Sequence, residues 1–142
     1  MSYLNIFMIE DDDDHAELSS RAVRKSKIPH EIKRFCDGNE AIESLETGYT
    51  FSNGKPANII LLDLKLPKID GFGVLEVLRS KEPFTTIPVI ILSTSSVQQD
   101  IDRAYELGAN SYLQKPVDVV DFQTMVRDLS IYWGEWNQQS TQ

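Results

Sequence analysis

The most telling segment of the chain is IILLDLKLPKIDG, residues 59–71. Its first four residues are apolar, which is typical of a strand buried on both faces of a parallel sheet. Asp63 follows this run directly, and Pro67 and the pair Asp70-Gly71 come soon after it. The segment therefore predicts a buried strand that ends on a single carboxylate, followed by a loop and a helix.

A second segment near the N-terminus has the same arrangement. The apolar run IFMI, residues 6–9, is followed by Glu10, Asp11 and Asp12. Because ligands bind outside the carboxyl ends of the strands in an open α/β sheet, we expect Glu10, Asp11 and Asp63 to converge on one point. Three carboxylates in one pocket repel one another unless a cation is bound or one is protonated. Mg²⁺ suits such a cluster, since it prefers oxygen ligands.

Two further apolar runs end on polar side chains. Residues 89–92, VIIL, run into Ser93-Thr94-Ser95, and residues 112–114, YLQ, run into Lys115-Pro116. The predicted edge of the sheet therefore carries an acidic pair, a lone aspartate, a hydroxyl and a lysine, in that order along the chain.

Strands and helices alternate along the chain. The apolar runs predict strands near residues 4–9, 31–35, 59–62, 89–92 and 112–114, each followed by a helix. We expect the first helix over about 14–27, the fourth over about 98–107, and the last to begin at an N-cap, Asp118. This alternation implies right-handed βαβ units and a parallel sheet, the doubly wound α/β class.

Composition restricts the class of protein further. A chain of 142 residues with 41% hydrophobic residues fits one globular domain with an ordinary core. Its net charge of −8 argues against a nucleic-acid-binding surface, and its single cysteine excludes an intrachain disulfide. The N-terminus lacks a basic signal-peptide region and no apolar run approaches ~18 residues, so we expect a cytoplasmic protein without membrane attachment.

These motifs together resemble the receiver domain of two-component response regulators, over roughly residues 3–130. The resemblance implies a flavodoxin-like (βα)5 fold with strand order 2-1-3-4-5. It also implies that residues 1–142 form a single receiver domain, with about 131–142 as a helical extension and tail. The expected function is a phosphorylation switch that accepts a phosphoryl group from a sensor histidine kinase. Such a protein is not an enzyme with a separate substrate, although it has phosphotransfer and autodephosphorylation activity of its own.

The resemblance also implies roles for the acidic residues. Asp63 would be the phosphoacceptor, because an acyl phosphate forms on an accessible carboxylate beside a charge-neutralising metal. Mg²⁺, or Mn²⁺ in its place, would be held by Glu10, Asp11, Asp63 and the backbone carbonyl of Lys65. Asp12 and its acidic neighbours are expected only to cap the first helix.

The remaining roles concern the phosphoryl group and the switch. Lys115 would bond Asp63 and later a phosphoryl oxygen, aimed by a cis Lys115–Pro116 bond as in the resembling family. Ser93 would donate its hydroxyl to the phosphoryl group, and the rotamer of Tyr112 would follow Ser93. Side chains expected to tune the lifetime of the phosphoryl group are Lys65, Thr94 and Ser95. His15 and His30 are interpreted as surface histidines.

Three other functions fit the sequence less well. A haloacid-dehalogenase-like phosphatase needs a second Asp two residues after its nucleophile, where this chain has Lys65. A flavodoxin-like FMN carrier would have its phosphate repelled by the acidic run at residues 10–14. A degenerate receiver that only binds partners would not need the intact set of Glu10, Asp11, Asp63, Ser93 and Lys115.

Softer similarities point to the small regulators of cyanobacterial and bacterial phytochromes, and so to a light-sensing kinase. They are the long loop before the third strand, Ile87-Pro88 before the fourth strand, Leu92-Ser93-Thr94-Ser95, Asn110-Ser111-Tyr112 and Tyr132-Trp133. A receiver serving a non-light kinase, or an intermediate of a multi-step phosphorelay, remains an alternative. The downstream target is not indicated by the sequence.

The last helix also predicts homodimerisation, through the face of the fourth helix, fifth strand and fifth helix. Its apolar stripe extends further than one core-facing stripe requires, and tryptophan is favoured at the centres of interfaces. The predicted interface residues are Phe122, Met125, Leu129 and Trp133. The alternative is that Trp133 only covers the core and that Trp136 lies in a frayed or loosely docked tail, residues 136–142.

Overall fold

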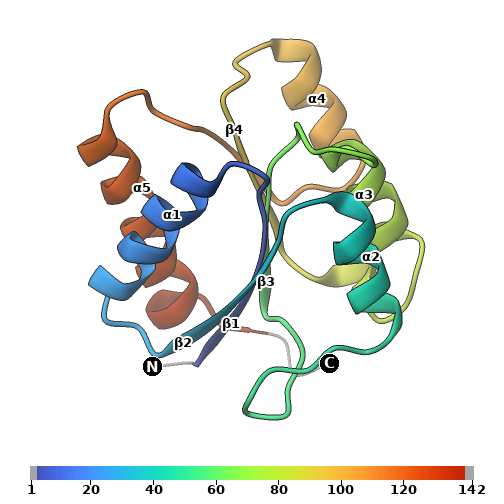
Figure 1. Ribbon diagram of the computed structural model, residues 1–142, viewed down its shortest axis with the longest axis horizontal. Coiled ribbons are helices and arrows are strands. Elements are labelled where there is room, and N and C mark those ends of the chain that lie inside the picture. Colours follow the sequence, from blue (N-terminus) through green and yellow to red (C-terminus); the bar gives the residue numbers. More distant parts are fainter. Residues whose placement is uncertain (1–2, 140–142) are drawn as a thin grey trace.

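The computed structural model describes residues 3–139, which build one parallel sheet of five strands in the order β2-β1-β3-β4-β5 (Figure 1). This order confirms the expected doubly wound topology. The strands are β1 (Leu4–Ile9), β2 (His30–Phe35), β3 (Ile59–Leu62), β4 (Val89–Ser93) and β5 (Ser111–Gln114).

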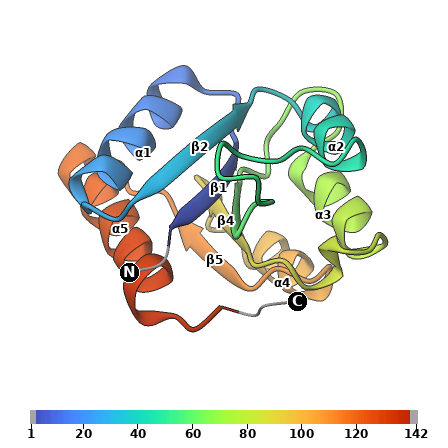
Figure 2. The ribbon, with the colours of Figure 1, turned by 90° about the horizontal axis from the view of Figure 1, so that it is seen from below.

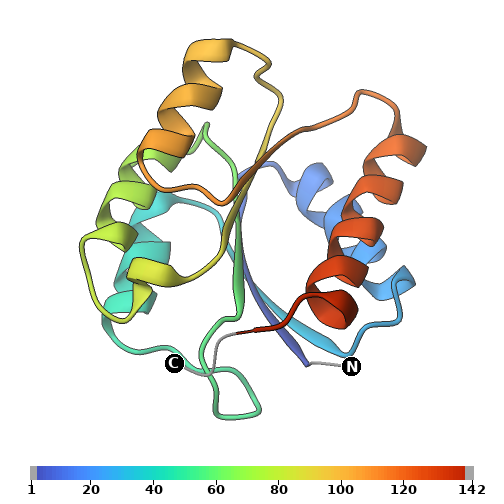
Figure 3. The same cartoon turned by 180° about the vertical axis from the view of Figure 1, so that it is seen from behind.

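Helices cover both faces of this sheet. They are α1 (Asp13–Lys25), α2 (Gly38–Glu46), α3 (Gly71–Arg79), α4 (Gln98–Glu106) and α5 (Val119–Ile131), with a short 3-10 helix at Phe84–Thr86. Figure 2 shows α1 and α5 on one face and α2, α3 and α4 on the other, and the view from behind agrees (Figure 3). Within residues 3–139, no helix is both long and apolar enough to cross a membrane.

Two hydrophobic cores lie on the two faces, and β1 contributes to both. Leu4, Ile6 and Met8 belong to the core under α1 and α5, whereas Phe7 and Ile9 belong to the core under α2, α3 and α4. All six residues of β1 are buried. A central strand that is apolar on both faces is what a doubly wound parallel sheet requires.

Aspartates define where four of the five helices begin. Asp12, Asp37, Asp70 and Asp118 are the N-caps of α1, α2, α3 and α5, and each side chain accepts a hydrogen bond from a backbone amide three residues on. Such caps satisfy amides that have no partner within the helix. The predicted caps at Asp12 and Asp118 are confirmed. The exception is α4, whose N-cap Val97 supplies no side-chain bond.

The prediction of a cis peptide bond at Lys115–Pro116 is wrong. The cis peptide bond found among the described residues joins Glu82 to Pro83. The amide of Lys115 donates to the carbonyl of Ser93 at 2.7 Å, so the pairing of β5 with β4 continues through Lys115. The sheet itself therefore directs the lysine toward the site.

The chain beyond α5 is docked rather than frayed as far as it is described. A π-helical turn, Tyr132–Trp136, prolongs α5. The amide group of Asn58 donates to the side chain of Gln139 at 3.0 Å, and Gln139 in turn donates to the Trp133 carbonyl at 3.4 Å. Residues 140–142, part of the predicted tail, lie outside the described residues.

Candidate functional site

Four strand ends bring the predicted site residues to one edge of the sheet. Glu10 follows β1, Asp63 follows β3 and Lys115 follows β5, while Ser93 closes β4. Ile9 pairs with Leu62 in the β1–β3 register, so Glu10 and Asp63 leave neighbouring strands side by side. Glu10, Asp63 and Lys115 are 6%, 8% and 5% exposed, so the cluster is almost closed to solvent.

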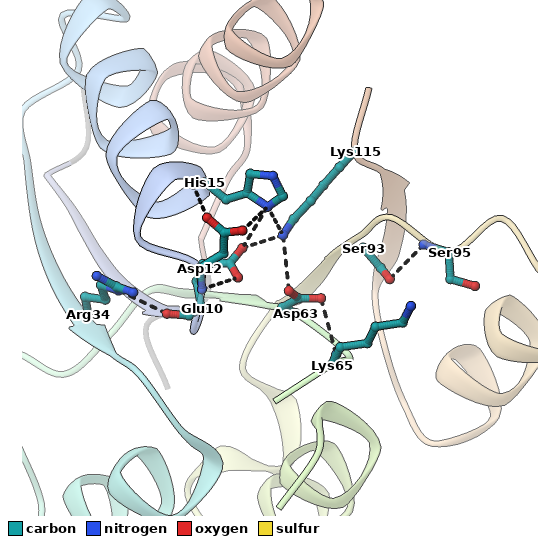
Figure 4. Close-up of polar contacts among 9 residues, drawn as sticks. All are labelled: Glu10, Asp12, His15, Arg34, Asp63, Lys65, Ser93, Ser95 and Lys115. Atoms are coloured by element: carbon teal, nitrogen blue, oxygen red, sulfur yellow. Dashed lines mark hydrogen bonds and ion pairs between the residues drawn. The ribbon is translucent and has the colours of Figure 1, made fainter. Parts of the chain in front are cut away.

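Lys115 is the centre of this cluster (Figure 4). Its ammonium donates to Oδ2 of Asp63 at 3.2 Å and makes a short hydrogen bond to Oε1 of Glu10. A third contact joins Nζ to Nδ1 of His15 at 3.0 Å. An ammonium has three donors, and all three of Lys115 are used. The expected contact of Lys115 with Asp63 is thus present in the structure.

Burial also acts on Glu10. The pKa of Glu10 is raised to about 7, mainly because burial desolvates the carboxyl group; the hydrogen bond from Lys115 lowers the pKa and the nearby charge of Asp63 raises it. Burial disfavours the charged form of a carboxyl group, while an opposite charge favours it. Glu10 is therefore a carboxyl group whose ionisation depends on what else occupies the site.

The three acidic residues form a set of metal donors. One carboxylate oxygen from each of Glu10, Asp11 and Asp63 can be chosen so that all lie within 4.8 Å of one another. Three hard oxygen donors, one of them on the exposed Asp11, fit Mg²⁺ or Mn²⁺, which keep several waters when bound. The Lys65 amide donates to Oδ1 of Asp63 at 3.3 Å, which brings the chain at Lys65 close to the site; its carbonyl as a ligand remains a prediction.

The Asp70-Gly71 pair packs against the backbone at the end of β3, next to Asp63. Gly71 donates its amide to the Leu64 carbonyl at 2.8 Å. A Cβ at position 71 would lie 2.3 Å from the carbonyl oxygen of Asp63, so a larger residue would displace the backbone of the phosphoacceptor candidate. Asp70 caps α3 by accepting from the Gly73 amide at 2.9 Å. The spacing of this motif thus has a structural cause, the close approach of α3 to the end of β3.

Ser93 and Tyr112 are connected through Ser95. Ser93 is fully buried, and its Oγ accepts from the Ser95 amide at 3.1 Å. The hydroxyl of Tyr112 donates to the Ser95 carbonyl at 2.9 Å. Ser95 also donates its own hydroxyl to Asp100 of α4 at 2.7 Å. Thr94, between the two serines, is exposed.

Two residues that contact the site were not recognised as site residues from the sequence. His15, expected at the surface, has a side chain that is only 31% exposed, and it contacts Lys115. Helical spacing could have revealed it, because His15 lies four and seven residues before the buried Ser19 and Ala22 of α1. Arg34 on β2 donates to the Glu10 carbonyl at 3.0 Å, and no sequence pattern marks it.

The predicted dimer residues are mostly occupied inside the molecule. Phe122 is 2% exposed and belongs to the core under α1 and α5, so its assignment to an interface is wrong. Met125, Leu129 and Trp133 are partly buried against the same core. The reason is that α5 packs along α1 as well as on the sheet, which uses a wider apolar stripe. Trp136 is 71% exposed.

A cavity of about 510 Å³ lies away from this cluster, near the start of β3. It is lined by residues of the loop before β3, the end of α2 and the segment at 81–84, and by Phe7. None of the predicted site residues lines it, so the polar cluster at the opposite ends of the strands remains the candidate site.

Comparison with known proteins agrees with this geometry. The chain is 36% identical over 132 residues to the "Probable methanogenesis regulatory protein FilR2" of Methanothrix harundinacea, covering 93% of this chain and 84% of that protein. It is 35% identical over 130 residues to response regulator Rcp1 of Synechocystis sp., covering 92% and 88%.

Solved structures show the same similarity. The Mn²⁺-bound form of Rcp1 matches with a TM-score of 0.88 and 33% identity over 97% of this chain and 99% of that one. The phosphorylated cyanobacterial phytochrome response regulator RcpA matches with a TM-score of 0.90 and 32% identity over 99% and 100%. Residues 6–127 match the family described as response regulator receiver domain. The chain therefore belongs to the response regulator receiver domain family of two-component signalling.

Proposed function

We propose that this receiver accepts a phosphoryl group on Asp63 from a phosphohistidine of a sensor histidine kinase, with Mg²⁺ bound by Glu10, Asp11 and Asp63. The observation that supports this most is the position of Asp63 at the end of β3, with one oxygen on Lys115 and the other on the Lys65 amide. Both contacts hold the carboxylate of Asp63 in place at the end of β3.

The chemistry follows from these residues. A carboxylate oxygen of Asp63 attacks phosphorus in line, a P–O bond forms, and the P–N bond of the donor breaks with its electron pair passing to the imidazole nitrogen. Bound Mg²⁺ supplies neutralisation of the phosphoryl charge. Lys115 exchanges its bond to Asp63 for one to a phosphoryl oxygen. The protein contributes positioning and electrostatics, which dominate phosphoryl transfer.

The switch begins at Ser93. On phosphorylation, the Ser93 hydroxyl turns to donate to a phosphoryl oxygen, and the Ser95 amide loses its acceptor. Ser95 is bonded to both Tyr112 and Asp100, so the change passes to β5 and to the first turn of α4. About two added negative charges then bias an existing equilibrium of the α4–β5–α5 surface.

We propose a phytochrome-like kinase as the partner. The similarity to Rcp1 and RcpA supports it, since RcpA is described as a phytochrome response regulator. A non-light kinase or a relay intermediate is the second candidate, and the similar identity to FilR2 favours it. Light-dependent transfer from a purified phytochrome kinase, compared with transfer from an unrelated histidine kinase, discriminates the two. A kinase source of the phosphoryl group also requires a cytoplasmic location.

The phosphoacceptor role is tested with acetyl phosphate and Mg²⁺. Intact-mass measurement should show one added phosphoryl group on the wild type and none on Asp63→Asn. Asp14→Asn is the matched control, because Asp14 is an exposed carboxylate of the same acidic run. EDTA should abolish the reaction. Equal labelling of wild type and Asp63→Asn would refute the proposal.

A further inference from the structure

His15 occupies a position in the site that the proposed chemistry does not use. It lies in the first turn of α1, and its Nδ1 is 3.0 Å from Nζ of Lys115. The carboxylates that could compete for Nδ1 are further away, with Oε1 of Glu10 at 4.0 Å and Oδ2 of Asp12 at 3.9 Å. The lysine is therefore the nearest polar partner of the ring.

The direction of this hydrogen bond follows from the chemistry of the pair. An ammonium has donors and no acceptor, so Nδ1 must accept and must carry no proton. The ring is then neutral, with its proton on Nε2. Of the three acceptors around Lys115, His15 is the one that is not a carboxyl group, since the others belong to Glu10 and Asp63.

The His15 ring is itself held in place from two sides. The His15 amide donates to Oδ1 of the N-cap Asp12 at 3.0 Å, which fixes the first turn of α1. The ring lies against Phe122 of α5, with centroids 5.7 Å apart. Lys115 has a long flexible stem, and its two carboxylate partners are the groups that metal and phosphoryl group would engage. His15 is the acceptor that neither of them needs.

From this geometry we propose that His15 is a positioning residue for Lys115, an uncharged acceptor that keeps the ammonium aimed at Asp63 while its carboxylate partners are exchanged. The proposal rests on the proposed phosphoacceptor function of Asp63. It predicts one specific tautomer of His15 and a slower phosphorylation when the acceptor is removed.

The tautomer is measured by long-range ¹H–¹⁵N NMR on untagged protein at about pH 8.5, where imidazoles are generally neutral. The chain has two histidines, and the second is an internal reference. Nδ1 of His30 lies 2.8 Å from the Ile28 carbonyl, which can only accept, so His30 should carry its proton on Nδ1. His15 should show the opposite pattern, with its proton on Nε2. A proton on Nδ1 of His15 would overturn the proposal.

The positioning role is tested with His15→Leu and His15→Gln, using acetyl phosphate and Mg²⁺. His15→Leu should slow labelling of Asp63 about three- to tenfold, the effect of one lost hydrogen bond. His15→Gln, which has a side-chain acceptor, should restore most of the rate, and His30→Gln should leave it unchanged. A wild-type rate in His15→Leu, or equal slowing in both His15 variants, would overturn the proposal. Failure of the wild type to be labelled would instead refute the phosphoacceptor function, and the tautomer measurement would still decide the contact.

Discussion

At the scale of single residues, burial and charge compete most directly at Glu10. The carboxyl group is almost closed to solvent between Asp63 and Lys115. Burial raises the pKa of Glu10 to about 7 although Lys115 donates to it. The folded state without metal therefore binds a proton that the unfolded chain releases above pH 4.5. Mg²⁺ requires the ionised form, so proton and metal compete for the same group.

This competition predicts how stability depends on pH. Because the pKa of Glu10 is higher in the folded state, its contribution is complete at low pH and is lost as pH rises through about 7. In EDTA, we expect the free energy of unfolding in urea to fall by up to about 2–3 kcal/mol between pH 5 and pH 8. Glu10→Gln should remove most of this slope. A variant that keeps the wild-type slope would show that another group causes it.

At the scale of elements, α4 is held least firmly. Ala104 is its one buried residue, whereas α3, of equal length, has five. The side chain of Val97 cannot cap the helix, and the hydroxyl of Ser95 holds the first turn instead. It accepts from the Val97 amide at 3.2 Å and donates to the carboxylate of Asp100. Elements with few buried contacts open at low cost in free energy. We expect α4 to respond to phosphorylation, because its first turn depends on Ser95, which lies two residues after Ser93.

Ser95→Ala should therefore loosen α4 selectively. Loss of a cap costs about 0.5–2 kcal/mol, so amide hydrogen exchange in the first turns of α4 should become faster, while exchange in α3 stays unchanged. Ser96→Ala is the matched control, because Ser96 is exposed and adjacent. Identical exchange in the two variants would mean that Ser95 does not hold the helix.

At the scale of the whole molecule, the fold was largely predictable. The apolar runs predict β1, β3 and β4 because these central strands are buried along their whole length, whereas the edge strands β2 and β5 are only partly buried. The aspartate caps mark helix starts within about two residues. The site was predictable where a side chain follows a strand end directly, as Glu10, Asp63 and Lys115 do. These features depend on local sequence and on a regular topology.

The errors have a common physical cause. The amide of Lys115 pairs with the carbonyl of Ser93, 22 residues away in the chain, and this pairing directs the lysine without the predicted cis bond. The position of His15 depends on how α1 is rotated against α5, and the burial of Phe122 depends on the same contact. Each is decided by packing between distant segments, which a local pattern does not contain.

The dimer remains a proposal, now carried by the exposed end of α5. Trp136 and Tyr132 are 71% and 53% exposed, whereas Trp133 also packs on the core. We expect Trp136→Ser to weaken self-association at least fivefold in sedimentation equilibrium, without unfolding the protein, because burial of a tryptophan contributes strongly to interfaces. A wild type that stays monomeric at about 100 μM, with and without acetyl phosphate, would exclude the dimer.

The most direct test of the whole account is to locate the phosphoryl group. Borohydride reduces an aspartyl phosphate to homoserine, which peptide mass spectrometry assigns to one position. After treatment with acetyl phosphate and Mg²⁺, we predict homoserine at Asp63 and at none of the carboxylates of residues 10–14, and no homoserine in EDTA. Homoserine at Asp11, or none at Asp63 in protein that has gained a phosphoryl group, would contradict the account.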